Sequence, residues 1–279
     1  MSGRTRVAVV TDSAAALPDD IAARWSIRVV PMWITVGGEA ELEGARPLDE
    51  LIGLPEVSTS APTPGEFATT YAAALEHADA VVVCTIAASM SATHEAARLA
   101  AAGFQDRVRV VDSRSAAGGE ALVALAAARA AAAGASLDAV VERACAVAAR
   151  VRLIATVPNL DHLVRSGRVP GIAGWAGKKL GINPLFEFAG GRIRRLRPAL
   201  SADAAAERMV AHVARSAVAG GRLHAVALHA LALPVAEELA ARLRPFDPDE
   251  VFVGAFGPVM VVHTGPGLAG IAWWWEAPG

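Results

Sequence analysis

The sequence contains few cysteines, few aromatic residues and no excess of positive charge. Two of its 279 residues are cysteines, Cys84 and Cys145, and neither has the spacing of a metal ligand. Lysine and arginine number 26 against 28 acidic residues, so no global positive field exists to hold nucleic acid or an anionic membrane. No secretory hydrophobic region follows Met1, which together with the low cysteine count predicts a cytoplasmic protein.

The apolar content is high enough for a large core. Apolar residues make up 54% of the chain, and the length predicts about two domains. The stretch from Gly254 to Trp275 contains no Asp, Glu, Lys or Arg and is long enough to cross a bilayer. Glycines and prolines interrupt it too often for a lipid-facing helix, so we expect short buried strands there.

The order of apolar runs predicts an α/β protein. Short β-branched runs alternate with helical patterns through the first half of the chain, which is typical of parallel βαβ units. Beyond about residue 152 a hairpin signal appears, Gly190-Gly191 between two short strands. We therefore predict a mostly parallel, Rossmann-like sheet with helices over residues 1–156 and an α+β domain with an antiparallel or mixed sheet over residues 157–279. The predicted strands include residues 7–10, 29–36, 80–86, 108–111, 152–157, 185–188, 193–196, 224–231, 259–262 and 269–275.

Standard cofactor motifs fail on their context. The glycines from Gly265 to Gly270 match the dinucleotide-binding pattern, but only nine residues follow Gly270, too few for the helix, strand and acidic residue that the motif requires. The Gly-Lys pair within residues 171–179 lacks the spacing and the hydroxyl of a phosphate-binding loop. The sequence offers no standard way to bind ATP, NAD or zinc, and we expect neither a cofactor nor a metal.

Polar residues follow the predicted parallel strands directly. Because ligands of open α/β sheets bind at the carboxyl ends of the strands, these positions are candidate binding residues. Hydroxyls beside a helix start suit a carboxylate or phosphate, although each residue alone is more often a simple helix cap. The candidates at strand ends and helix starts are Asp12, Ser13, Thr59, Ser60, Ser89, Ser91, Thr93, Asp112 and Ser113.

A basic stretch lies between His162 and Leu200. It contains eight arginines and lysines and a single acidic residue, Glu187, and it predicts either a local anion-binding patch or a solvated surface. Arg168 follows Gly167, where a turn could direct its guanidinium inward. His263 ends an apolar run, where a histidine is more often a core residue than a functional one. The basic residues are Arg165, Arg168, Lys178, Lys179, Arg192, Arg194, Arg195 and Arg197.

Taken together, these motifs resemble the DegV family of bacterial fatty-acid-binding proteins. The resemblance spans almost the whole chain, and it departs from the family pattern at Ala61, Ala92 and Asn183, where Gln, Gly and Lys are usual. The fold prediction does not depend on these positions, whereas ligand preference does. The matching segments are residues 7–13, Val30-Pro31, Thr59-Ser60-Ala61-Pro62, Ser91-Ala92-Thr93, Val111-Asp112-Ser113, Gly167-Arg168-Val169, residues 180–184 and residues 263–267.

The resemblance implies a binding subunit that is not itself an enzyme. Such a protein holds one long-chain fatty acid between its two domains and presents the carboxyl group to a separate kinase subunit for acyl phosphate formation, a step of phospholipid metabolism. Thr59 and Ser91, with Ser60 and Thr93 beside them, would bind the fatty-acid carboxylate. Arg168 and His263 would lie at the pocket mouth and neutralise phosphate charge. The implied partners are the fatty acid, the kinase subunit and, transiently, a membrane surface.

Two other functions fit the same residues. A hydrolase or acyltransferase would use Ser91 or Thr59 as nucleophile, His263 as base and Asp12 or Asp112 to orient the base. A lipid carrier or sensor would bind the acyl chain without any kinase partner.

Overall fold

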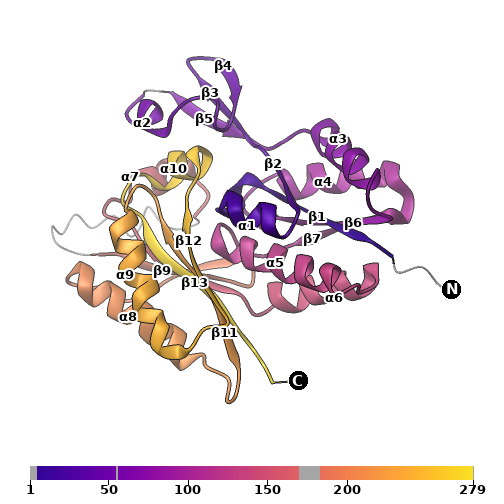
Figure 1. Cartoon of the computed structure of the whole chain (residues 1–279). Helices are drawn as coiled ribbons and strands as arrows, with labels where there is room; N and C mark the ends of the chain where they lie inside the picture. The colour runs from indigo at the N-terminus through magenta and orange to yellow at the C-terminus, as the bar shows by residue number, and fades with distance from the viewer. Residues whose placement is uncertain (1–4, 55, 170–182, 279) are drawn as a thin grey trace.

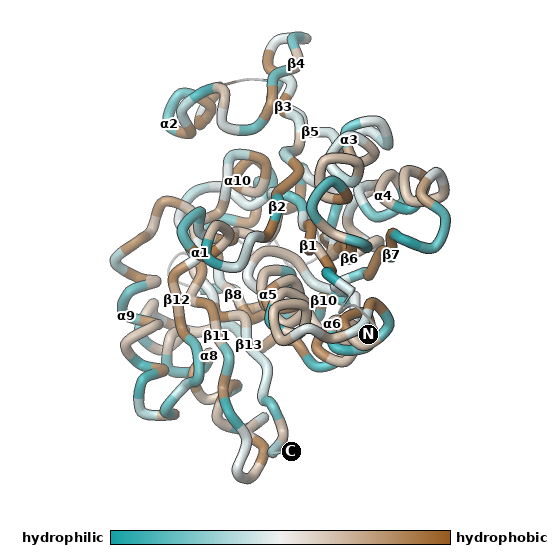
Figure 2. Tube along the Cα trace, turned by 45° about the vertical axis from the view of Figure 1, so that its right-hand side comes forward, coloured by the Kyte–Doolittle hydropathy of each residue, from teal (hydrophilic) through white to brown (hydrophobic). Residues whose placement is uncertain are grey.

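The structure, a computed structural model, describes residues 5–54, 56–169 and 183–278 (Figure 1). It contains two large sheets and one small sheet, with helices packed on the large ones. One large sheet is parallel and the other is mixed, so the predicted two-domain α/β fold is confirmed. Figure 2 shows hydrophobic colouring along the strands of both large sheets and alternating colour on the outer helices.

The first large sheet is fully parallel and has four strands in the order β2-β1-β6-β7. Helices α3 and α4 pack on one face, and α5 and α6 pack on the other. A capping box, with Thr63 and Glu66 bonded reciprocally, begins α3 as the sequence predicts. These elements are β1 (Val7–Asp12), α1 (Asp19–Arg24), β2 (Ile27–Val30), α3 (Pro64–Leu75), β6 (Ala80–Thr85), α4 (Thr93–Ala101), β7 (Val108–Asp112), α5 (Gly118–Ala132) and α6 (Leu137–Ala148).

The second large sheet is mixed and has six strands in the order β10-β9-β8-β13-β11-β12. Helices α8 and α9 cover its outer face. Strand β8 lies on the N-terminal side of the predicted boundary after residue 156, yet it pairs with β9 and β13 of this sheet. The boundary itself remains a prediction. The elements are β8 (Arg152–Thr156), α7 (Asp161–Ser166), β9 (Leu185–Ala189), β10 (Arg192–Arg195), α8 (Ala202–Arg215), β11 (Arg222–His229), α9 (Leu233–Leu243), β12 (Glu250–Ala255), α10 (Pro258–Thr264) and β13 (Ala269–Glu276).

Helix α5 joins the two large sheets. Every residue from Gly118 to Ala128 is buried, because α5 contacts β1 and β6 on one side and β11 and β13 on the other. Apart from Glu120, the residues of this buried stretch are apolar on every face of the helix, so both sheets can pack against it. A Cβ at Gly118 would lie 2.7 Å from Cβ of Val226, so only glycine allows this close approach.

Two predicted strands are wrong. Residues 29–36 form two strands in different sheets, because Pro31 cannot donate a ladder hydrogen bond and the chain leaves the first sheet there. Residues 259–262 lie in α10, with Pro258 at its first position. A short buried run of apolar residues has the same pattern in a strand and in a helix, which explains the error.

The small sheet was not predicted. Its three antiparallel strands, in the order β4-β3-β5, form a separate layer beside α10 (Figure 1). Thr59 and Ser60 lie on β5 and not at a helix start as the sequence suggested. The elements of this layer are β3 (Trp33–Val36), β4 (Glu39–Leu42), α2 (Leu48–Leu51) and β5 (Val57–Ser60).

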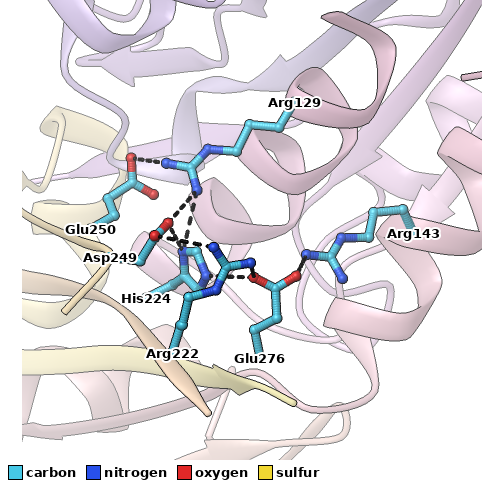
Figure 3. Close-up of polar contacts among 7 residues, drawn as sticks. All are labelled: Arg129, Arg143, Arg222, His224, Asp249, Glu250 and Glu276. Atoms are coloured by element: carbon cyan, nitrogen blue, oxygen red, sulfur yellow. Dashed lines mark hydrogen bonds and ion pairs between the residues drawn. The ribbon is translucent and has the colours of Figure 1, made fainter. Parts of the chain in front are cut away.

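A network of ion pairs connects α5 and α6 to one end of strands β11, β12 and β13 of the second sheet (Figure 3). Three arginines face three carboxylates, so the charges balance while His224 is neutral. The His224 ring is buried and stacks on Trp274, with centroids 4.6 Å apart, and burial lowers its pKa. Because Arg129 can only donate to Nδ1 of His224, the ring proton must lie on Nε2, which faces Glu276 at 3.3 Å. The charged members are Arg129, Arg143, Arg222, Asp249, Glu250 and Glu276.

Candidate functional site

Two adjoining cavities lie between the small sheet and helices α7 and α10. The outer cavity has a volume of about 720 Å³ and is lined by α2, the segment after it, β5, α7 and α10. The inner cavity has a volume of about 70 Å³ and extends toward the carboxyl end of β6. The outer volume falls within the range of roughly 300–1,000 Å³ that is usual for ligand sites. This cavity pair is the candidate functional site.

Four residues line both cavities and so mark the junction between them: Thr59, Ser166, Arg168 and His263. They come from β5, the end of α7, the turn after it and the end of α10. Sequence analysis singled out three of them, Thr59, Arg168 and His263, which lie far apart in the chain, and only the family resemblance implied that they share one pocket. The fold brings them together, because α10 packs against both β5 and α7.

The turn after α7 directs Arg168 toward the junction. Gly167 ends the helix in a left-handed conformation, with φ of +65°, which favours glycine. Nη1 of Arg168 donates to the carbonyl oxygen of Ser166 at 3.1 Å and lies 3.2 Å from Nδ1 of His263. The guanidinium is therefore held at both of these contacts.

These contacts determine the tautomer of His263. A guanidinium only donates, so Nδ1 of His263 accepts from Arg168 and the ring proton lies on Nε2. Nε2 lies 2.7 Å from Oγ1 of Thr59 and donates to it. The hydroxyl proton of Thr59 is then available to an acceptor in the cavity. The chain of donors from Arg168 through His263 to Thr59 suits an anion at the junction.

The environment of His263 keeps its ring neutral. Burial, and secondarily the charge of Arg168, lower the pKa of His263 from its ordinary value of 6.5 to about 4. A neutral ring is a weak base at neutral pH, and it needs no carboxylate partner.

Folding stability should fall in acid because of His263. The unfolded chain takes up a proton on this residue near pH 6.5 and the folded chain only near pH 4, so acidification through this window favours unfolding. Replacing His263 with glutamine should reduce the loss of unfolding free energy between pH 7 and pH 4.5 by about 2 kcal/mol. Urea titrations of both proteins at the two pH values measure this difference. Equal pH dependence in the two proteins would show that His263 does not titrate abnormally.

The inner cavity has mainly apolar walls. Three of the five methionines, Met32, Met90 and Met260, line it together with Ile86, which follows β6, and with apolar side chains of α7 and α10. Methionine is flexible and fills irregular spaces, so walls of this kind can adapt to the shape of an apolar ligand. Sequence analysis missed this role, because methionines at single positions of different elements give no pattern.

Two serines that the resemblance implies as carboxylate ligands, Ser60 and Ser91, lie at the inner cavity. Ser60 and Ser91 line the inner cavity, whereas Thr93 is fully buried behind it. Oγ of Ser91 lies 2.8 Å from Oγ1 of Thr93, and it accepts a hydrogen bond from the Thr93 amide. Thr93 therefore holds the side chain of Ser91 and does not itself face the cavity.

The other strand-end candidates support the loops behind the site and do not line either cavity. Asp12 is fully buried and accepts hydrogen bonds from the amides of Ala14 and Ile86. Burial raises its pKa to about 6, and burial also raises the pKa of the neighbouring Glu120. Asp12 thus fixes the end of β6, where Ile86 faces the inner cavity.

Ser13, Asp112 and Ser113 have similar structural roles. Oγ of Ser13 accepts from the amide of Met32 at 3.0 Å. Oδ1 of Asp112 accepts from the amides of Ala88 and Arg114, and Ser113 donates to a carbonyl two residues away. The convergence of polar residues at the strand ends was predicted, and the structure shows that most of them bond to backbone.

Glu43 is a further residue that sequence analysis missed. It follows β4, and its Oε1 accepts from the amide of Val259 at 2.9 Å, in the first turn of α10. A Cβ at Gly257 would lie 2.5 Å from the same oxygen, which explains the glycine before Pro258. The small sheet and the residue after it therefore contact both ends of α10. Glu43 binds Val259 at the start of the helix, and Thr59 binds His263 near its end.

The predicted basic stretch is divided by the fold. Arg165 and Arg168 line the outer cavity, Lys178 and Lys179 lie outside the described residues, and the remaining arginines are on or near the β9–β10 hairpin. Among the described residues no group of three or more His, Cys, Asp or Glu side chains could hold a metal ion. No helix of the described residues is long and apolar enough to cross a membrane.

Comparisons with known proteins agree with the sequence resemblance. Residues 6–276 match the family model described as "Uncharacterised protein, DegV family". A DegV domain-containing protein of Mycobacterium tuberculosis is 38% identical over 270 residues, covering 95% of this chain and 96% of the relative.

Solved structures are similar over the whole chain. A DegV family protein of Thermus thermophilus, described as binding fatty acid, superposes with a TM-score of 0.89 at 30% identity and covers 96% of this chain and 99% of its own. DegV of Bacillus subtilis, described as a fatty acid binding protein, gives 0.82 at 25% identity, with coverage of 98% and 100%.

Proposed function

Because this chain belongs to the DegV family, we propose that it binds one long-chain fatty acid in the cavity pair and presents the carboxyl group to a separate kinase subunit. The acyl chain lies in the inner cavity, and the carboxylate lies at the junction. The observation that supports this most directly is the donor chain from Arg168 to Thr59, placed where an apolar cavity meets a wider, more polar one. The relatives from Thermus and Bacillus are described as fatty-acid-binding proteins, which favours the same ligand class.

The energetics assign different roles to the two ends of the ligand. Burying an acyl chain of about 16 carbons at about 0.8 kcal/mol per CH₂ contributes up to roughly 12 kcal/mol before ordering costs. The carboxylate loses water in the cavity, at a cost of several kcal/mol unless protein donors replace it. Thr59 and Ser91 supply hydroxyl donors there, so they set the orientation of the ligand while the tail supplies most of the affinity.

The inner cavity must widen to accept the tail. Its volume of about 70 Å³ exceeds the space for one water molecule but is far below that of an acyl chain. Rotation of Met32, Met90 and Met260 enlarges the space with little change in backbone, because these side chains have several accessible rotamers. Ala61 also lines this cavity, at a position where the family usually has Gln. Its side chain is smaller and less polar than that of Gln, so it occupies less of the cavity.

The geometry favours binding over hydrolysis. In a hydrolytic triad a carboxylate faces the second ring nitrogen of the histidine and stabilises its protonated form. Here Arg168 occupies that position, and its charge contributes to a His263 pKa of about 4. Ser91 bonds to Thr93, and among the described residues it makes no hydrogen bond with His263. Asp12 and Asp112 bond to backbone amides elsewhere.

Features of the outer cavity support the proposed presentation of the carboxyl group to a kinase. Arg168 keeps guanidinium N–H groups beyond its contacts with Ser166 and His263, and it lines the wider space in which a phosphoryl group would arrive. A protein with this role works in the cytoplasm, receives its ligand by transient contact with a membrane surface and serves phospholipid synthesis. The competing carrier or sensor role would use the same cavities without any transfer step.

Lipid content tests the binding proposal directly. Native mass spectrometry of the purified protein should show about one acyl chain per molecule, and solvent extraction should release it. Ala61→Phe fills the inner cavity, so this variant should retain little lipid, while Ala72→Phe, at an exposed position of α3 outside both cavities, serves as a control. Absence of lipid in the wild-type protein, together with no stabilisation by added oleate or palmitate, would refute the proposal.

Loss of either hydroxyl should weaken headgroup binding. Ser91→Ala and Thr59→Ala each remove a donor from a buried carboxylate, so the affinity for oleate should fall by about 10- to 100-fold, since such bonds contribute roughly 1.5–3 kcal/mol. A thermal-shift titration with oleate measures the change. Thr69→Ala, whose hydroxyl bonds only to the Gly65 carbonyl on α3, is the matched control. Wild-type shifts in both cavity variants would place the headgroup elsewhere.

A further inference from the structure

A second concave site lies at the β9–β10 hairpin, apart from the cavity pair. It has a volume of about 510 Å³ and is bounded by the turn before β8 on one side and by the hairpin on the other. Four of its nine lining residues are arginines: Arg150, Arg152, Arg192 and Arg194. We call this site the arginine groove. It shares no lining residue with the cavity pair, so it does not belong to the proposed fatty-acid site.

The strand register places three of these arginines on one face of the sheet. Arg152 and Arg192 both pair with Ala189, from opposite sides of β9. Arg194 pairs with Glu187, two residues before Ala189 on the same strand. Since directly paired residues and residues two apart share a face, the guanidinium groups extend from the same side of β8 and β10. The small side chain of Ala189 leaves space between them.

A single buried carboxylate positions two of the arginines. Glu187 is fully buried; its Oε1 accepts from Nη2 of Arg152 at 2.5 Å, and its Oε2 accepts from Arg194. The Arg152 guanidinium also lies 5.7 Å from the centroid of the Trp273 ring. One carboxylate neutralises only one of the two arginines, so this pair keeps one positive charge while its geometry is fixed.

The other two arginines of the groove add positive charge that no acidic side chain of the described residues neutralises. Arg150 and Arg192 are exposed, and neither makes an ion pair or side-chain hydrogen bond within the described residues. The groove therefore has a net charge of about three positive units, from four arginines and one glutamate, on a chain whose total charge is −2. Such local charge in a concave site attracts a compact anion.

We propose that the arginine groove binds an oligophosphate group, as in inorganic tripolyphosphate or the phosphate chain of a nucleotide. Arginine forks match phosphate oxygens in bidentate geometry, and several linked phosphates supply three or more negative charges in a small volume. A single lipid phosphate supplies fewer charges. No aromatic side chain lines the groove, so the phosphate chain is recognised and a base is not stacked.

Calorimetric titration of the full-length protein with tripolyphosphate tests the proposal. Arg150→Ala combined with Arg192→Ala removes the two unpaired guanidinium groups without breaking the Glu187 pairs, and it should raise the Kd at least about tenfold. Arg28→Ala combined with Arg107→Ala removes the same charge at exposed positions outside the groove and should change the Kd less than about twofold. Orthophosphate should bind at least about tenfold more weakly than tripolyphosphate.

Every outcome of these titrations either supports or overturns the arginine groove proposal. Absence of heat with wild-type protein at millimolar tripolyphosphate, or equal weakening by the two double variants, would overturn the proposal. Flotation with phosphatidylglycerol vesicles separates the source of the phosphate: vesicle binding that requires Arg150 and Arg192, without binding of soluble tripolyphosphate, would also overturn it. Unchanged tripolyphosphate binding by Arg168→Ala would support a site separate from the cavity pair.

Discussion

Replacing Arg168 with alanine is expected to slow acyl phosphate formation with the proposed kinase partner by about 10²–10³-fold, the usual effect of removing a donor that stabilises developing charge. Arg168 lines the outer cavity and has guanidinium N–H groups beyond its contacts with Ser166 and His263. Through His263 it also keeps the Thr59 proton available. His263→Ala should reduce the rate in the same direction. Oleate affinity should change by less than about tenfold in both variants, since the tail supplies most of it.

The assay must measure transfer and binding on the same proteins. Arg165→Ala is a suitable control, because Arg165 lines the outer cavity without a hydrogen bond to His263 among the described residues. If Arg168→Ala and His263→Ala lose binding and transfer in equal proportion, the two residues are ground-state ligands of the carboxylate. If neither quantity changes, their assigned role is wrong, and these side chains only form a solvated surface. A wild-type protein that supports no transfer at all would instead favour a carrier function.

Replacing Glu276 with alanine should destabilise the fold by about 2–4 kcal/mol, because Arg143, which is partly buried, loses its acidic partner and Arg222 keeps only Asp249. Glu276 accepts from Arg143 on α6 and from Arg222 on β11, and it faces Nε2 of His224. The side chains of Glu276 and His224 are 18% and 4% exposed, so water replaces the lost contacts only in part. The change also unbalances a network of three arginines and three carboxylates (Figure 3).

An exposed ion pair provides the comparison. Glu238→Ala breaks a pair with Arg242 on the surface of α9, where the expected loss is below about 1 kcal/mol. Urea denaturation followed by circular dichroism gives both values under the same conditions. If the two variants are equally stable, the network around Glu276 contributes no more to stability than a surface ion pair.

Much of the fold follows from local patterns in the sequence. The alternation of apolar runs and helical patterns predicts the parallel sheet, and the Gly190-Gly191 turn predicts the β9–β10 hairpin, because these signals depend on residues close in the chain. The apolar run 259–262 is predicted as a strand because its local pattern fits a strand as well as a helix. The hydrogen bond from the Val259 amide to Glu43, in the first turn of α10, joins residues too far apart in the chain to give a local signal.

The candidate site is less accessible to such reasoning. Polar residues at strand ends were predicted as a group to bind the ligand. Asp12 and Asp112 bond to backbone amides, whereas Thr59 lines both cavities. The difference depends on whether a backbone donor lies within reach, which local sequence does not show. The methionine walls of the inner cavity were missed for a related reason, since they come from three distant segments.

The sequence by itself determined the fold class, the family and the chemical types available for binding: hydroxyls, one arginine after a glycine and one histidine in an apolar run. These depend on composition, periodicity and motif order. Only the tertiary structure decided that Arg168, His263 and Thr59 form one chain of donors at the junction of two cavities. Hydrogen bonds act over about 3 Å, and residues 59 and 263 come within that distance only after α10 has packed against the small sheet.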